Sequence, residues 1–284
     1  GGATLLFLPP SLRSGGKMNN IHKTALVVVV TLALILSVIS LASSDGEITD
    51  NTFNHDYDAT DANPAYSVEF SINESADGTN SVTINKIIAN SPNTRIETGT
   101  SVKNEGIEYN ITGIADDAFK IEEKTNITTI IVPNTVKTVD GPIFSDLPNL
   151  EMLKFSGNTT ITGEGLARNC VSLTSFSALA TVSGTLNASF EGCTSLEKFN
   201  PMGNFSFGDN AFKGCTGLKT VTSNKCKSIG DNAFDGCIAL TSVATATCTS
   251  VGANAFNGCY SLTNVILGAD CEFGKTPFSG CSAL

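Results

Sequence analysis

The feature that most constrains the fold is a repeat of about 22 residues that runs through the second half of the chain. Its clearest column recurs at a nearly constant spacing and holds phenylalanine at every position but one, where alanine stands. A single coil of this length cannot bury its own apolar face, whereas stacked coils share a continuous core. The repeat therefore predicts a solenoid. The column comprises Phe119, Phe144, Ala167, Phe190, Phe212, Phe234, Phe256 and Phe278.

Two more columns follow the phenylalanines at intervals of three residues. Cysteine comes first, from Cys170 to Cys281, and leucine follows, from Leu150 to Leu284. Intervals of three predict one face of a short helical or 3₁₀ turn, with Asp209 as its N-cap and Gly214 where it stops. The predicted core ladder of the three most regular coils is Phe212, Cys215, Leu218, Phe234, Cys237, Leu240, Phe256, Cys259 and Leu262.

The leucine column opens a predicted strand. Residues 150–158 (LEMLKFSGN) follow the pattern L-x-x-L-x-L-x-x-N/C, with phenylalanine in place of the third leucine. Strands of successive coils would pair in parallel about 5 Å apart. The predicted fold class is an α/β-type repeat solenoid with coils of about 22–23 residues. It has a parallel β-sheet on one face and short helical or 3₁₀ turns on the other.

The combined pattern resembles the BspA-like subclass of leucine-rich repeats. Three stretches carry the resemblance in register: residues 207–218 (FGDNAFKGCTGL), 229–240 (IGDNAFDGCIAL) and 251–262 (VGANAFNGCYSL). The start at residues 108–119 (EYNITGIADDAF) is similar to the usual entry into such arrays. The resemblance implies a secreted or surface protein, and adhesion is the function of several family members. Ala167 departs from the pattern, which leaves the coil shape there open.

The N-terminal stretch has the layout of a targeting segment. Residues 1–17 lack an initiator methionine and are interpreted as upstream translation. Residues 18–42 carry Lys23, an apolar run over 25–41 and small residues before Ala42, as in a cleaved signal peptide. An uncleaved N-terminal anchor is the alternative, since the apolar run approaches spanning length. Both interpretations predict an exported chain.

Three segments follow this leader. Residues 43–64 are polar and acidic and predict a flexible linker. Residues 65–112 contain alternating runs around a turn, which predict a small β module that caps the solenoid. Residues 113–284 hold the repeats, and Leu284 opens a strand that the sequence does not contain. We therefore expect a native chain that continues with further repeats or an anchor.

The nine cysteines have three possible interpretations. Six of them share one repeat column, and Cys226 and Cys248 occupy the inward-facing N/C column, so buried thiols that pack as small apolar groups are favoured. Disulfides between neighbouring coils are the main alternative. A zinc site is disfavoured, because equally spaced cysteines form a ladder rather than a tetrahedral cluster.

Composition excludes several function classes. The only histidines, His22 and His55, lie outside the repeats, so no Cys-His or Ser-His-Asp arrangement can be built there. Residues 269–276 (ADCEFGKT) resemble a P-loop but lack its first glycine. The formal charge of −10 disfavours nucleic acid and anionic lipid. We expect no enzyme activity, no cofactor and no metal.

Six Asn-x-Ser/Thr sites occur in the chain. Asn158 and Asn204 fall in the inward-facing N/C column, so we expect them to stay unmodified. Asn73 and Asn126 lie outside this column and are the better candidates for N-glycosylation.

A binding partner would use the solvent face of the predicted sheet. The exposed positions are small, polar and weakly charged, which suits broad contact with protein or glycan more than a deep small-molecule pocket. We therefore predict a non-enzymatic protein, secreted or on the cell surface, that mediates adhesion to host or neighbouring-cell macromolecules. A structural spacer that displays another domain is the alternative, and any membrane contact would come through an N-terminal or C-terminal anchor. The predicted face comprises Lys198, Asn200, Thr220, Thr222, Asn224, Ser242, Ala244, Asn264 and Ile266.

Overall fold

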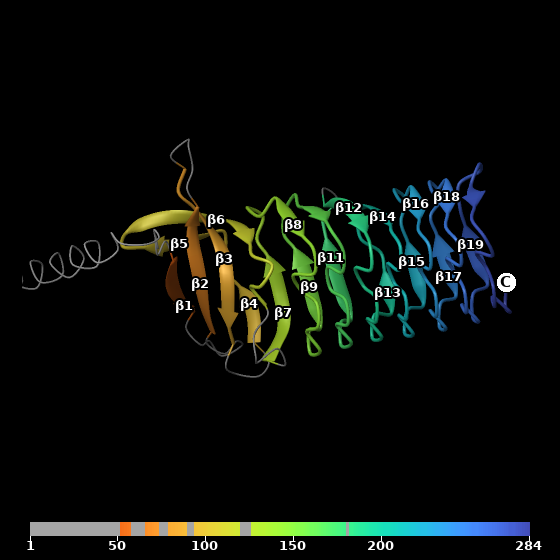
Figure 1. Ribbon diagram of the computed structural model, residues 1–284, viewed down its shortest axis with the longest axis horizontal. Helices are drawn as coiled ribbons and strands as arrows, with labels where there is room; N and C mark the ends of the chain where they lie inside the picture. The colour runs from red at the N-terminus through yellow and green to blue at the C-terminus, as the bar shows by residue number, and fades with distance from the viewer. Residues whose placement is uncertain (1–51, 58–65, 74–78, 90–93, 120–125, 180–181) are drawn as a thin grey trace, which may run out of the picture. The chain divides into compact units, whose positions relative to one another are not determined.

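The computed structural model describes residues 52–57, 66–73, 79–89, 94–119, 126–179 and 182–284 (Figure 1). Contacts divide the chain into two compact units, and all described residues belong to the second, Asn51–Leu284. The predicted upstream stretch and the signal peptide or anchor lie outside the described residues and stay predictions. No helix among the described residues is long and apolar enough to cross a membrane.

An antiparallel and parallel mixed sheet precedes the solenoid. Its strand order is β1-β2-β3-β6-β5, with β3 and β6 parallel and the other neighbours antiparallel. Alternating apolar side chains such as Val68 and Phe70 are buried beneath it, as the sequence pattern predicts. The bounds are Thr52–Tyr57 for β1, Tyr66–Asn73 for β2, Ser81–Ile88 for β3, Ser101–Asn104 for β5 and Ile107–Ile114 for β6.

Two predicted boundaries of this module need correction. Thr52–Tyr57, expected within the flexible linker, forms the edge strand β1. Phe53 stacks on Phe70 with ring centroids 5.4 Å apart, and Tyr57 stacks on Tyr66 at 4.7 Å. The acidic residues between these rings hide the alternation from a reading of composition. At the other boundary, Thr94–Glu97 (β4), expected within the cap module, pairs in parallel with the first strand of the solenoid.

The solenoid has two sides made of parallel strands. The odd-numbered strands form the four-stranded sheets β11-β9-β7-β4 and β13-β15-β17-β19, which we call the odd-strand face. Their bounds are Ile127–Val132 (β7), Met152–Phe155 (β9), Ser175–Ala178 (β11), Lys198–Phe199 (β13), Thr220–Thr222 (β15), Ser242–Ala244 (β17) and Asn264–Ile266 (β19). Pro201 follows β13 at the position of Ser223, whose N–H donates to Ala244 of the next coil, and proline has no such donor.

The even-numbered strands form one seven-stranded sheet, β20-β18-β16-β14-β12-β10-β8, which the sequence analysis did not foresee. We call its solvent side the even-strand face. In Figure 1 the two sets of arrows alternate along the stacked coils. The bounds are Thr138–Asp140 (β8), Thr160–Thr162 (β10), Ser183–Leu186 (β12), Asn204–Phe207 (β14), Ser228–Ile229 (β16), Ser250–Val251 (β18) and Glu272–Phe273 (β20).

The third side consists of tight turns, so the prediction of helical or 3₁₀ turns was wrong: no helical element is assigned among the described residues. Asn210, Asn232 and Asn254 adopt left-handed backbone angles, with φ of 56°, 54° and 54°, in the middle of each predicted helical stretch. A left-handed residue breaks a right-handed helix. Alternate N–H groups instead donate to the next coil, as Phe212 does to Ala233 at 2.7 Å.

The aspartate expected to cap a helix has a different role. The Oδ1 atom of Asp209 accepts a hydrogen bond from the backbone N–H of Asp231 in the next coil, at 2.8 Å. Asp231 repeats this contact with the N–H of Ala253, at 2.6 Å. The carboxylates therefore join successive coils and satisfy backbone donors at the corner between the even-strand sheet and the turns. Gly214 does end its turn with a left-handed conformation, with φ of 71°.

The core is built from the predicted columns. All nine residues of the predicted core ladder are buried, each with an exposed fraction of 0%. Successive rings of the phenylalanine column from Phe212 to Phe278 stack with centroids 5.2 Å apart and an interplanar angle of 3°. This distance is close to the spacing of neighbouring strands, so ring stacking and backbone pairing share one repeat distance.

Substitution of Asn232 distinguishes the left-handed turn from a helix. We expect Asn232→Gly to leave the free energy of unfolding nearly unchanged and Asn232→Ala to lower it by about 1 kcal/mol, because alanine is strained at positive φ. A helix would give the reverse order, since alanine is the better helix former. Urea denaturation of the two variants beside the wild-type chain measures this order.

Candidate interaction surface

The odd-strand face brings most of the predicted interaction residues into two straight rows. The register pairs Lys198 with Thr220, Ser242 and Asn264 along the first row. The amide of Asn264 donates to the Ser242 hydroxyl at 3.1 Å, so neighbours along the row contact each other. The second row comprises Thr222, Ala244 and Ile266.

Two predicted members of this face lie outside its strands. Asn200 follows β13, and Asn224 lies in the turn beyond β15, although both side chains are exposed. The strands are short, and Ser223 already points inward behind Thr222. Asn224 therefore belongs to the rim of the surface rather than to its sheet.

Sequence reasoning missed the first half of the odd-strand face. The register pairs Arg95 with Thr129, Met152 and Ser175 in one row. The second row comprises Glu97, Ile131, Lys154 and Ser177. Met152 and Leu179, just beyond β11, are exposed apolar side chains on this half. The repeat is degenerate here, but the run ITTIIV at residues 127–132 was a readable strand signal.

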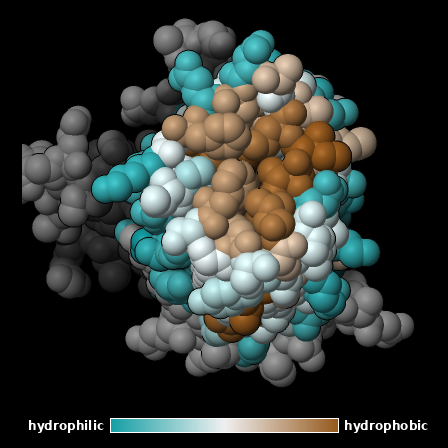
Figure 2. Space-filling view, turned by 90° about the vertical axis from the view of Figure 1, so that its right-hand side faces the viewer, coloured by the Kyte–Doolittle hydropathy of each residue, from teal (hydrophilic) through white to brown (hydrophobic). Residues whose placement is uncertain are grey.

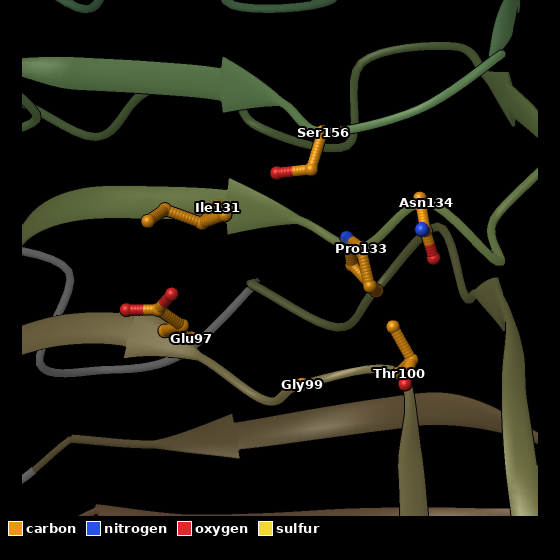
Figure 3. Close-up of a pocket in the computed structure, with 7 residues that line it drawn as sticks. All are labelled: Glu97, Gly99, Thr100, Ile131, Pro133, Asn134 and Ser156. Atoms are coloured by element: carbon orange, nitrogen blue, oxygen red, sulfur yellow. The ribbon is translucent and has the colours of Figure 1, made fainter.

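A small recess lies at the carboxyl ends of three neighbouring strands of this face. Its volume is about 160 Å³, and Figure 3 shows its lining residues at the ends of β4, β7 and β9. Ile131 and Pro133 contribute its apolar part, and Glu97 and Ser156 contribute polar groups. A cavity this small is below the size of sites for drug-sized ligands, so it suits one side chain of a partner better. The full lining is Glu97, Gly99, Thr100, Ile131, Pro133, Asn134 and Ser156.

The even-strand face presents a different surface. One outward row crosses all seven strands, and it holds five hydroxyl side chains between two carboxylates. The Thr162 hydroxyl donates to Asp140 at 2.7 Å, so part of the row is satisfied internally. This row contains no large apolar side chain. Its members are Asp140, Thr162, Thr185, Ser206, Ser228, Ser250 and Glu272.

A third apolar surface lies at the end of the last coil. Figure 2 views this end and shows apolar residues gathered on it. Phe273 is 53% exposed there, whereas Ile229 and Val251 of the same column are buried by the coils that follow them. The apolar character of this end therefore comes from core columns and not from an outward row.

The cysteine column has a structural explanation. All nine cysteines are free thiols, and those from Cys170 to Cys259 are buried. Each thiol of the main column donates to a backbone carbonyl of the preceding coil, as Cys215 does to Phe190 at 2.9 Å and Cys237 to Phe212 at 3.1 Å. Desolvation by burial raises the pKa of the Cys215 and Cys237 thiols well above the ordinary value. Thiolate chemistry at neutral pH is therefore disfavoured in this column.

The remaining sequence motifs form no reactive site among the described residues. His55 packs edge-on against Tyr57 in the N-terminal sheet, with ring centroids 4.8 Å apart, and His22 lies outside the described residues. No group of three or more metal-ligating side chains is found in the part of the chain that the structure describes. In the P-loop-like stretch, the N–H of Gly274 donates to Val251 at 2.7 Å, which is a contact between coils.

The structure also corrects the glycosylation predictions. Asn126 is only 9% exposed, and its amide donates to the Ala89 carbonyl at 2.6 Å, so it has no room for a glycan. Asn158 and Asn204, expected to point inward, are exposed. Thr159 and Phe205, one residue further on, take the inward position in these coils.

Asn73 is partly buried, and its glycosylation stays a prediction. Its amide group lies within hydrogen-bonding distance of Ser81 and Thr112, each at 3.2 Å, and it accepts from Thr83 at 2.9 Å.

Parallel strands, a buried leucine column and short coils of nearly constant length define a leucine-rich repeat solenoid. A family model described as BspA type Leucine rich repeat region matches six copies, over residues 98–219 and 206–284. The chain belongs to this family.

Solved structures agree with this assignment at the level of the fold. A leucine-rich repeat protein of T. pallidum is 19% identical, with a TM-score of 0.53, and the match covers 76% of this chain and 87% of that one. A leucine-rich repeat protein of Bacteroides ovatus is 18% identical, covering 80% and 81% of the two chains, with a TM-score of 0.38. A leucine-rich cell surface protein of Faecalibacterium prausnitzii is 18% identical, covering 85% and 82%, with a TM-score of 0.39. A comparison with curated protein sequences finds no match.

The buried thiols make stability depend on pH. In the unfolded chain a thiol ionises near pH 8.5, whereas burial keeps Cys237 protonated, so the free energy of unfolding falls as the pH rises above this value. We expect Cys237→Ala to be less stable at pH 7 but to lose stability more slowly above pH 8.5. The slope should differ by up to about 1.4 kcal/mol per pH unit.

Urea denaturation between pH 7 and 10 measures this slope, with Ser228→Ala as a control that removes no thiol. Equal slopes for Cys237→Ala and wild type would contradict the proton count assigned to the buried thiol.

Proposed function

We propose that this chain is a non-enzymatic interaction scaffold that acts outside the cell and binds a partner macromolecule through the odd-strand face. One observation carries the proposal: only this face combines rows of small polar side chains with exposed apolar groups and a recess. Met152 is 36% exposed and Leu179 is 42% exposed, near the recess at Ile131. The outward row of the even-strand face holds hydroxyl and carboxylate groups alone.

The chemistry of the face favours a protein partner over a glycan. The outward positions of its strands carry methionine, isoleucine, serine, threonine and ion-paired side chains but no aromatic ring on which a sugar could stack. Interface centres depend on apolar anchors in well-packed pockets, surrounded by polar contacts. The recess beside Ile131 would receive such an anchor, and the threonine and serine rows would form the polar contacts around it.

Charges on this face are largely paired. Lys219 contacts Glu197 at 2.7 Å, and Arg95 contacts Glu97 at 2.9 Å. Exposed pairs of this kind contribute little to stability, and they leave few free charges to steer a partner. We therefore expect binding that depends only weakly on salt. Secretion or surface display is supported by the leader-like sequence of residues 18–42 and by the family that the repeats define.

Binding to intact animal cells and to immobilised matrix proteins tests the proposal. We expect Met152→Asp to weaken binding about tenfold, because a carboxylate at the apolar part of the interface must be desolvated. Thr220→Asp reports on the other half of the face. Ser228→Asp on the even-strand face is the matched control and should bind as wild type does.

Equal loss in the Ser228→Asp control would move the interaction away from the odd-strand face. Wild-type protein that binds none of these surfaces would instead favour a spacer that holds another domain. Thermal unfolding of each variant checks that the coils remain folded.

If the chain is made in a compartment that attaches N-linked glycans, the exposed sequons should be the modified ones. We expect glycopeptides carrying Asn158 and Asn204, because both side chains face solvent, and none carrying Asn126, which is buried. Glycopeptide mass spectrometry of secreted protein measures the occupancy. A modified Asn126 in folded protein would contradict the packing of β7 against the cap module.

A further inference from the structure

A second, shorter column of thiols lies next to the even-numbered strands. Cys226 and Cys248 each precede by two residues the register partners Ser228 and Ser250 of β16 and β18. Neighbouring parallel strands place such equivalent residues about 5 Å apart. Both cysteines are fully buried, and their thiols also donate to the carbonyls of Ser228 and Ser250, each at 3.2 Å.

The two thiol columns differ in what the sulfur atoms contact. In the main column, hydrogen bonds lead away from each thiol to a backbone carbonyl, as from Cys237 to Phe212. In the second column the thiols are hydrogen-bonded to one another, Cys226 to Cys248 and Cys248 to Cys271. Sulfur atoms of neighbouring coils therefore face each other only here among the described residues.

We propose that Cys226 and Cys248 form a disulfide that joins two neighbouring coils. The expected separation of their backbones falls within the range of about 4.4–6.8 Å that a disulfide bridges. Cys271 directly precedes β20, whereas Cys226 and Cys248 precede their strands by two residues, so Cys271 lies outside this register. We assign it the role of a third thiol that stays reduced.

The oxidant would be a small-molecule disulfide such as glutathione disulfide. The thiolate of Cys248 attacks one sulfur of this molecule, which forms a mixed disulfide and releases one glutathione thiolate. The thiolate of Cys226 then attacks the Cys248 sulfur, which closes the protein disulfide and releases the second thiolate. Two protons leave the protein thiols, and the small molecule takes up the two electrons.

The surroundings of Cys248 support its role as the attacking group. Hydrogen bonds from Cys226 and then from its other neighbours lower the pKa of Cys248 to about 6, against the desolvation by burial that raises it. A thiolate is the nucleophile in thiol–disulfide exchange. Because both sulfurs are buried, exchange requires local opening of the coils or occurs while they fold.

Peptide mapping of the full chain tests the pairing. Reduced protein is incubated with glutathione disulfide, quenched with N-ethylmaleimide, digested without reductant and analysed by mass spectrometry. We expect one linked pair, Cys226 with Cys248, and alkylated thiols at the main column after denaturation. A chain with no linked peptides, or with Cys248 linked to Cys271, would overturn the proposal.

Thermal unfolding provides a second measurement. Oxidation should raise the melting temperature of the wild-type chain by roughly 5–10 °C, as expected for closing a loop of this length. Cys237→Ala, in the main column beside the same coils, should keep this shift, and Cys226→Ala should lose it. A shift that persists in Cys226→Ala would contradict the assignment, and the mapping of wild-type protein decides the pairing even if that variant fails to fold.

Discussion

The structure depends on the hydrogen bonds that each coil makes with the next one. On the two sheet sides these are ladder bonds between parallel strands, and on the third side they are bonds such as Asn232 to Ala253 at 2.9 Å. One coil on its own has too little core to be stable, so its stability comes from its neighbours. The spacing imposed by these bonds also fixes which side chains can stack, since the phenylalanine rings repeat at 5.2 Å.

This constraint explains why cysteine recurs in a chain with no visible thiol chemistry in that column. The site between the phenylalanine and leucine columns is fully buried and faces a carbonyl of the preceding coil. A side chain there must be small and apolar and yet satisfy an acceptor. Cysteine meets all three demands, because it packs as a small apolar group with a weak S–H donor. Serine would bring a more polar hydroxyl, and alanine would leave the acceptor without this contact.

Sequence reasoning found the core because core columns repeat, and it failed where backbone conformation decides. The spacing of Phe212, Cys215 and Leu218 is the same in a helix and in a chain of turns, so it could not reveal the left-handed turn residues. The second sheet went unseen because its strands are as short as Ser228–Ile229, too short for an alternating pattern.

The inward position before the even-numbered strands shows the same limit. In the regular coils it is held by Cys226, three residues before the buried Ile229. In the less regular coil, Thr159 takes it, two residues before the buried Ile161, as the alternation of an extended chain requires. Asn158 is therefore left facing solvent, although it matches the cysteine column in the sequence. The candidate surface was half predicted for a related reason, since its residues were sought only in the regular coils.

The same division separates what the repeat holds constant within the chain from what it leaves free. Inward positions are bound to the spacing of the coils, and each repeats the residue type of its neighbours. Outward positions on the odd-strand face carry no such duty, and they vary from Met152 and Lys154 to Thr220 and Ser242. The even-strand row is more uniform, and its hydroxyl groups fit a flat polar side. A partner that reads differences between coils would find them on the odd-strand face. The first half of that face, where the repeat is least regular, therefore offers the most distinctive surface for recognition.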